Sequence, residues 1–183
     1  MSLSKEVFLR QSDNLKLSIY GTQKLLRLEG ACGSLLYPLY TEFLYSKEKK
    51  KLWLKNSSKS NQKEAFLKMY HILLAQAALG VLVGYRRQLN IVGIGYQVSL
   101  EKKEADSFMI FKLGYSHQVF IKVPSYVTVS CPKPRILQLR GINLQKLNNL
   151  AAVIRRLKLP SAYKEKGIYY AGEPFSLKQG KKS

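Results

Sequence analysis

The sequence predicts an α+β fold: two tandem similar domains, each an antiparallel sheet covered on one face by one helix, followed by a basic C-terminal arm. In each half, segments with strand-type alternation precede a single helical pattern. The halves also share a Gly-to-Pro segment, at residues 30–38 and 114–124, which indicates an internal duplication of about 85 residues. We therefore expect domains at residues 1–84 and 85–159, with the arm at 160–183.

The strands of the first half are expected where apolar and polar residues alternate. Residues 15–29 alternate in this way, with Gly21 as a break, and strand-forming residues continue over 35–44 and 52–54. The Lys-rich segment 47–51 is expected to be a turn, and a solvated surface and an RNA contact are equally supported there.

One long helix is expected over residues 62–83, with Asn61 as its N-terminal cap and Gly84 as a left-handed stop. Its segment 69–83 is apolar, but it is shorter than the roughly 20 residues of a membrane span and it contains polar side chains. A buried core helix is therefore favoured over a membrane anchor. Gly80 is then expected to be a point of close packing against the sheet.

The second half repeats this plan. A helix over residues 144–158 has an apolar face, Asn143 can cap it, and Pro160 ends it. The strands of this half are expected at residues 89–100, 107–113, 119–123 and 136–139.

The charge of the chain indicates a polyanionic partner. Its 31 Lys and Arg residues outnumber 11 Asp and Glu residues, so the formal net charge is +20 at pH 7. Such a charge makes a compact free protein repel itself, which favours nucleic-acid binding over a merely solvated surface. Residues 85–183 carry 18 basic and 5 acidic residues, so the second half is expected to be the main RNA-contacting part.

The composition also bears on the compartment. Abundant Lys and Tyr, taken together with Asn, Ile and Phe, suggest an A/T-rich coding genome, which fits an organelle, although some bacteria share this bias. Cys32 and Cys131 have no partner at ligand spacing, which is typical of inert thiols in a reducing compartment. Neither a secretory signal nor a transit peptide is readable, so we expect synthesis inside the organelle.

The loop after the second helix carries the residues best suited to RNA. Tyr163 can stack on a base, while Lys164 and Lys166 can reach phosphate oxygens. Gly167 permits a turn or a close approach of the main chain. Pro160 is expected to direct the chain out of the helix as an extended arm. The further cations of this arm, expected to become ordered on RNA, are Lys178, Lys181 and Lys182.

Three residues at the end of the helix and one turn histidine are further candidates for RNA contact. Arg155, Arg156 and Lys158 lie at the helix end, where they suit the helix dipole and also adjoin the binding loop, so both roles stay open. His117 has no acidic or nucleophilic partner pattern, and we expect it to contact RNA or backbone rather than to act as an acid or base.

No active site is predicted. Segment 93–96 lacks the third glycine and the opening helix of a nucleotide-binding loop, and His71 is most simply a core histidine. No carboxylate pair, metal-ligand spacing or nucleophile motif is present, so we expect no enzyme activity, no metal and no cofactor. An RNA-processing enzyme and a DNA-binding protein with a readable helix are the weaker alternatives.

Three segments of the second half match a known family signature in order and approximate spacing. Residues 160–168 contain a Pro that leads into Tyr-Lys and then Lys-Gly-Ile. Residues 93–96 read Gly-Ile-Gly-Tyr, and residues 113–117 read Leu-Gly-Tyr-Ser-His. In these segments the chain resembles the bacterial-type large-subunit ribosomal protein L6 family.

This resemblance implies the same two-domain architecture and a structural role in the large ribosomal subunit. It implies binding of large-subunit rRNA near the factor-binding region, beside the sarcin–ricin loop and the stalk base, in support of translation. Neighbouring large-subunit proteins near the stalk base are the other expected partners, with no membrane and no homo-oligomer. We expect the mitochondrial version, in the matrix, with plastid or bacterial cytoplasm as alternatives. The alternative function is that of a non-ribosomal nucleic-acid-binding protein.

The chain departs from the family pattern at three positions. Ala162 and Gln118 stand where a Pro is usual, and Glu165 stands where a small residue is usual. Because a carboxylate repels phosphate, an RNA contact by this loop requires that Glu165 be paired with Lys164, Lys166 or another cation in the assembled particle.

Overall fold

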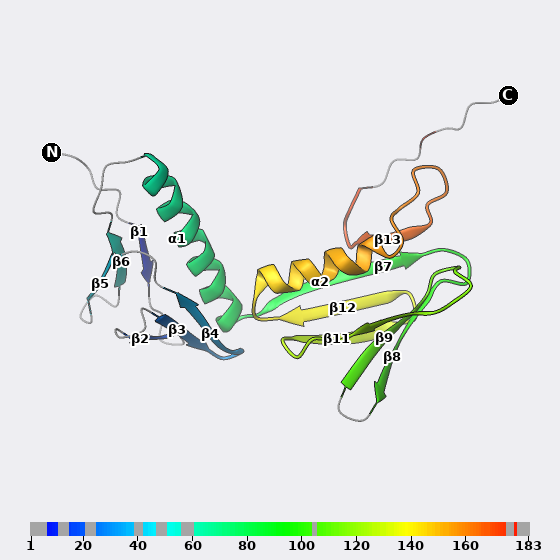
Figure 1. The fold of residues 1–183 in the computed structure, drawn as a ribbon, viewed down its shortest axis with the longest axis horizontal. Helices are drawn as coiled ribbons and strands as arrows, with labels where there is room; N and C mark the ends of the chain where they lie inside the picture. Colours follow the sequence, from blue (N-terminus) through cyan, green and yellow to red (C-terminus); the bar gives the residue numbers. More distant parts are fainter. Residues whose placement is uncertain are drawn as a thin grey trace. The chain divides into compact units, whose positions relative to one another are not determined.

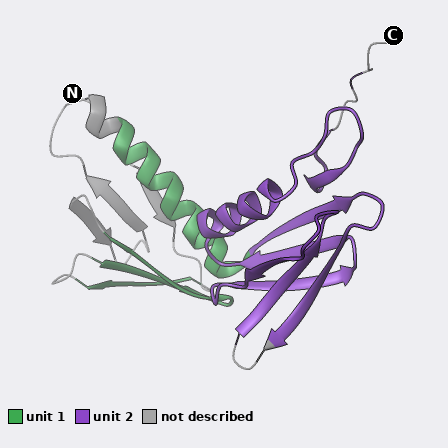
Figure 2. Ribbon diagram, turned by 45° about the vertical axis from the view of Figure 1, so that its right-hand side comes forward, with its two compact units in different colours: residues 1–84 green, residues 85–183 purple. Residues whose placement is uncertain are grey.

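The chain divides into two compact units, Met1–Gly84 and Tyr85–Ser183 (Figure 2). In each unit antiparallel strands accompany one helix that packs on strands, so the predicted α+β class is confirmed. The computed structural model describes residues 7–10, 15–20, 25–38, 42–46, 51–55, 61–103, 106–174 and 178.

The elements of the first unit are β1 (Val7–Arg10), β2 (Lys16–Tyr20), β3 (Leu25–Gly30), β4 (Gly33–Pro38), β5 (Glu42–Ser46), β6 (Lys51–Lys55) and α1 (Asn61–Leu82). They form two three-stranded sheets, in the orders β2-β3-β4 and β1-β6-β5. The expectation of one sheet per domain is therefore wrong for the described residues. The reason is a long-range pairing, because β1 joins β6 instead of extending the β2–β4 meander.

Helix α1 buries one face and exposes the other, where the sequence predicted a buried core helix. Tyr70, Leu74 and Val81 are buried, whereas Ile72 is 55% and Leu79 56% exposed. Among the described residues, α1 is the one helix long and apolar enough to cross a membrane by length and composition, a test that core helices of soluble proteins also pass. It begins at Asn61 itself, so this residue is part of the helix rather than its cap.

Close packing between α1 and its sheet occurs at a glycine of β3. A Cβ added to Gly30 would lie 2.5 Å from the main-chain oxygen of Val81. That same oxygen accepts a hydrogen bond of 2.9 Å from the Cys32 amide. Gly80, the predicted packing point, is buried, but the close approach that excludes a side chain is at Gly30.

The elements of the second unit are β7 (Tyr85–Val92), β8 (Gln97–Lys103), β9 (Asp106–Lys112), β10 (Val119–Lys122), β11 (Val127–Lys133), β12 (Ile136–Gly141), α2 (Leu144–Arg156) and β13 (Gly167–Tyr170). They form a four-stranded sheet, β11-β12-β7-β13, and a three-stranded sheet, β10-β9-β8. Helix α2 lies along one face of the four-stranded sheet (Figure 1). Its buried side chains share one apolar core with residues of both sheets, including Leu89, Phe111 and Leu139.

The second unit departs from the predicted strands in two places. The strand expected over residues 89–100 is divided, because Gly93 and Gly95 have φ of 154° and 74° and turn the chain between β7 and β8. Strands β11 and β13 were not predicted, and each is an edge strand of the four-stranded sheet. The predicted cap of α2 is confirmed, since the Asn143 side chain accepts a 3.1 Å hydrogen bond from the Lys146 amide.

Candidate nucleic-acid interface

The segment after α2 is a closed loop rather than the extended arm that was predicted. The Ser161 amide donates to the Lys166 carbonyl oxygen, and the Ile168 amide donates to that of Lys158, each over 3.0 Å. The chain then enters β13, which pairs with β7. The second bond ties the loop to the exit of α2, so the position of the loop is set by the sheet and the helix together.

Gly167 closes this loop. Its φ is 150°, and a Cβ there would lie 2.6 Å from the Cα of Pro160. Gly167 is also buried, so its observed role is to let β13 pass against the start of the loop. Lys178 contributes through its main chain, since its amide donates a 3.0 Å hydrogen bond to the Ala162 oxygen.

The tip of the loop exposes an aromatic ring and two ammonium groups. Tyr163 is 63% exposed, and Lys164 and Lys166 are exposed on the same tip. Together with Arg135 of the β11–β12 turn, these lysines line a shallow hollow of about 300 Å³. The residues that line this hollow are Val92, Gly93, Ile94, Arg135, Lys164, Glu165 and Lys166.

Glu165 is the structural exception in the loop. Its φ is 50°, in the left-handed region that non-glycine residues rarely adopt. In the part of the chain that the structure describes, its carboxylate forms no ion pair within 4.0 Å, so the pairing that the loop needs in the assembled particle is not made by these residues alone. Burial raises the pKa of the Tyr169 hydroxyl, and the nearby carboxylates of Glu165 and Glu173 raise it further.

A second aromatic group brings two of the predicted residues together. The Tyr115 hydroxyl donates a 2.9 Å hydrogen bond to the Leu157 oxygen at the end of α2. The Lys158 ammonium lies 4.3 Å from the centre of the Tyr115 ring, and the His117 ring stacks on the same ring at 5.9 Å between centroids. Tyr115 is therefore the centre of a small cluster of one ammonium group and two stacked rings, the Tyr115 cluster, and the sequence had pointed only to His117 and Lys158.

The two arginines at the end of α2 have different surroundings. Arg155 forms an ion pair with Glu173, and its guanidinium lies 5.3 Å from the centre of the Tyr170 ring. Glu173 also accepts a 3.1 Å hydrogen bond from the Tyr170 amide, so Arg155 braces the chain after β13. Arg156 is exposed and is the arginine of this pair directed to solvent.

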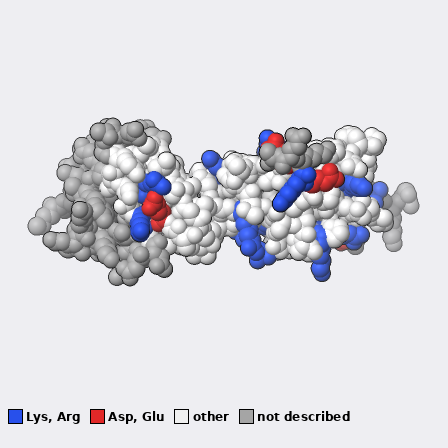
Figure 3. Space-filling view, turned by 90° about the horizontal axis from the view of Figure 1, so that it is seen from below, with Lys and Arg blue, Asp and Glu red and all other residues white. Residues whose placement is uncertain are grey.

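Other predicted residues lie apart from these clusters or outside the described chain. Lys181, Lys182 and residues 47–50 of the Lys-rich turn lie outside the described residues. In Figure 3, the Lys and Arg atoms of the second unit are spread over the visible face rather than gathered in one block. Three residues of these surfaces were not predicted from the sequence: Tyr115, Arg135 and Ile94, which is 86% exposed. Tyr115 and Ile94 lie in the glycine motifs at residues 113–117 and 93–96, and Arg135 lines the same hollow as Gly93.

Fold and composition together define a class: a strongly basic α+β protein. Within the described residues, no three His, Cys, Asp or Glu side chains are grouped as metal ligands. The exposed groups at the end of α2 and in the loop after it include cations and aromatic rings, which are side chains that bind RNA.

Comparison with known proteins places the chain within this class. Residues 92–171 match the family model of ribosomal protein L6. The large ribosomal subunit protein uL6 of Zymomonas mobilis is 35% identical over 158 residues, which cover 86% of this chain and 87% of the relative. The uL6 of Thermus thermophilus is 35% identical over 156 residues, which cover 85% of this chain and 84% of the relative. The uL6m of Reclinomonas americana is 38% identical over 130 residues, which cover 69% of this chain and 68% of the relative.

The chain belongs to the ribosomal protein L6 (uL6) family of large-subunit proteins. The predicted family and its structural, non-enzymatic role in the ribosome are thereby confirmed.

Proposed function

We propose that this protein binds large-subunit rRNA through the loop at residues 160–167 and the adjoining Tyr115 cluster. The observation that carries the proposal is the closed loop, which holds Tyr163, Lys164 and Lys166 exposed on one tip. Because its ends are hydrogen-bonded to each other and to α2, little chain entropy is lost when RNA binds. Lysines would hold phosphates, and the tyrosine ring would stack on an unpaired base.

The proposed location is the factor-binding region of the large subunit, beside the sarcin–ricin loop and the stalk base. The protein would clamp and neutralise rRNA helices there and contact neighbouring large-subunit proteins near the stalk base. The proposed domains are residues 1–84 and 85–159. Residues 160–183 would be the RNA-binding segment, of which the part up to Tyr170 is folded onto the second unit.

The proposed compartment is the mitochondrial matrix, with plastid and bacterial cytoplasm as alternatives. The support is the Lys- and Tyr-rich composition. Relatives named uL6 and uL6m match at similar identity, 35% and 38%, so both versions are compatible with the sequence.

Co-sedimentation tests the ribosomal proposal directly. The native protein should travel with large subunits through a sucrose gradient and be released by high salt, because phosphate contacts are screened. Sedimentation with nucleoid DNA and not with large subunits would instead support the alternative, a non-ribosomal nucleic-acid-binding protein.

A further inference from the structure

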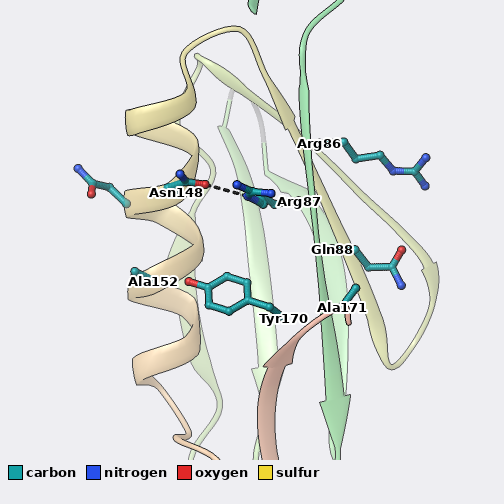
Figure 4. A pocket seen from close by; sticks show the side chains of 8 residues that line it. Arg86, Arg87, Gln88, Asn148, Ala152, Tyr170 and Ala171 are labelled. Carbon is teal, nitrogen blue, oxygen red and sulfur yellow. Dashed lines mark hydrogen bonds between the residues drawn. The ribbon is translucent and has the colours of Figure 1, made fainter. Parts of the chain in front are cut away.

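The four-stranded sheet of the second unit has one face that α2 leaves uncovered. Leu89, Leu137 and Leu139 point to the α2 side, where they share the apolar core. Their neighbours along the strands point the other way. Figure 4 shows this alternation on β7, with Arg87 directed toward α2 and Arg86 and Gln88 on the opposite side.

Side chains on the uncovered face form two cross-strand rows of polar groups. The strand register places Thr128 beside Arg140 and Arg140 beside Arg86. It places Ser130 beside Gln138 and Gln138 beside Gln88. None of these six residues, named here the cation–amide face, is acidic or aromatic. The exposed members are Arg86, Thr128, Ser130 and Arg140.

The arginine pair in this face is electrostatically uncompensated. Arg86 and Arg140 are directly opposite across the ladder, where like charges are destabilising. Neither forms an ion pair or a side-chain hydrogen bond in the described part of the chain. By contrast, Arg27 on a sheet of the first unit has Glu29 at 2.7 Å. An anionic partner would supply the negative charge that this arginine pair lacks.

A groove continues the face around the edge of the sheet. Strand β13 ends at Tyr170, opposite Leu89, so none of the described strands lies beside the edge of β7 next to Arg86 and Arg87. The groove encloses about 710 Å³, and α2 contributes Asn148 and Asn149 to its lining. The Nε of Arg87 donates a 2.9 Å hydrogen bond to the Asn148 side chain, which orients the outer guanidinium edge of Arg87.

We infer that the cation–amide face and this groove bind the sugar–phosphate backbone of a second RNA segment, in helical form. Guanidinium groups match phosphate oxygens in pairs, and amides and hydroxyls match the ribose 2′-hydroxyls of an RNA minor groove. The face carries no exposed ring on which an unpaired base could stack, which separates it from the Tyr163 loop. The inference rests on the proposed function, since the ligand is the same rRNA, but it shares no residue with that loop.

The test uses the full chain with the double substitution Arg86→Ala and Arg140→Ala. Its affinity for large-subunit rRNA should depend less steeply on salt, by about one to two units of slope. Hydroxyl-radical footprinting should lose protection over one helical segment and keep the protection given by the Tyr163 loop. The matched control, Lys102→Ala with Lys112→Ala, removes the same charge from exposed positions of β8 and β9 and should leave that segment protected.

Two further readouts separate recognition from folding. Because the arginines repel each other in the free chain, the Arg86→Ala, Arg140→Ala variant should melt at the same temperature as the wild type or higher. The neutral variant Gln88→Ala with Gln138→Ala should weaken rRNA binding about threefold to tenfold and leave the salt slope unchanged.

The opposite results would overturn the inference. If the arginine variant has the same salt slope and the same footprint as the Lys102, Lys112 control, this face does not bind RNA. An unchanged footprint together with lost incorporation into subunits would indicate an acidic protein partner instead. If the Lys164→Ala, Lys166→Ala variant changes RNA binding and the arginine variant does not, only the inference fails. If the wild-type chain shows no salt-dependent RNA binding, the proposed function fails with it.

Discussion

At the scale of single residues, Lys164 and Lys166 carry the electrostatic part of the proposed RNA contact. Each phosphate contact contributes a slope of about −0.7 to −0.9 to the dependence of binding on salt. Replacing both lysines with alanine is expected to flatten the slope by about one to two units, measured by filter binding over a salt series. A slope unchanged from the wild type would remove the loop from the interface.

Tyr163 is expected to contribute by stacking, because its ring is 63% exposed and held on a closed loop. Tyr163→Ala should weaken rRNA binding by about 1–3 kcal/mol, whereas Tyr163→Phe should keep most of the affinity. Tyr20, which is 44% exposed in the first unit, offers a matched control as Tyr20→Ala. Equal losses at the two tyrosines would argue against stacking.

Glu165 opposes both folding and binding at its position. Its positive φ is strained for a glutamate. Its carboxylate is exposed on the same loop as Lys164 and Lys166, the two lysines that are expected to bind phosphates. Asparagine tolerates the left-handed region, so Glu165→Asn should stabilise the chain by about 0.5–1 kcal/mol and strengthen RNA binding. Urea unfolding and filter binding measure the two effects. A weaker complex would mean that the carboxylate takes part in recognition.

At the scale of elements, the contact between β3 and α1 depends on the absence of a side chain at Gly30. A Cβ there would lie within 2.5 Å of the Val81 oxygen, which belongs to rigid main chain. Gly30→Ala should therefore cost about 1–3 kcal/mol in the free energy of unfolding, measured with urea. Ser34→Ala, at an exposed position of β4, should change it little. Equal effects would show that the sheet moves away from the helix freely.

The sequence predicted the features of helices and strands that depend on neighbouring residues, but it did not predict the pairings between segments far apart in the chain. Asn143 and Pro160 bracket α2 because capping and helix termination depend on immediate neighbours. Strand β13 escaped prediction because it is short and stabilised by β7, far away in the chain. For the same reason the ion pair between Arg155 and Glu173 could not be foreseen, and it gives Arg155 a structural contact within the second unit.

At the scale of the whole molecule, the net charge of +20 opposes the compact state of the free protein. Raising the ionic strength from about 0.01 M to 0.15 M shortens the Debye length from about 30 Å to 8 Å. The melting temperature of the free chain should therefore rise over this range, as calorimetry can measure. A large-subunit RNA fragment should raise it further at low salt, whereas a fall with added salt would contradict this account.

The α+β class, the helix positions, the family and the RNA-binding character could be read from the sequence, since these depend on periodicity, local motifs and total charge. Which of the predicted residues face solvent depended on the folded structure. It closed the Pro160 loop through Gly167, placed His117 and Lys158 against the Tyr115 ring, paired Arg155 with Glu173 and set Arg86 opposite Arg140. Such contacts arise from strand register and loop closure between distant segments, and no local pattern records them.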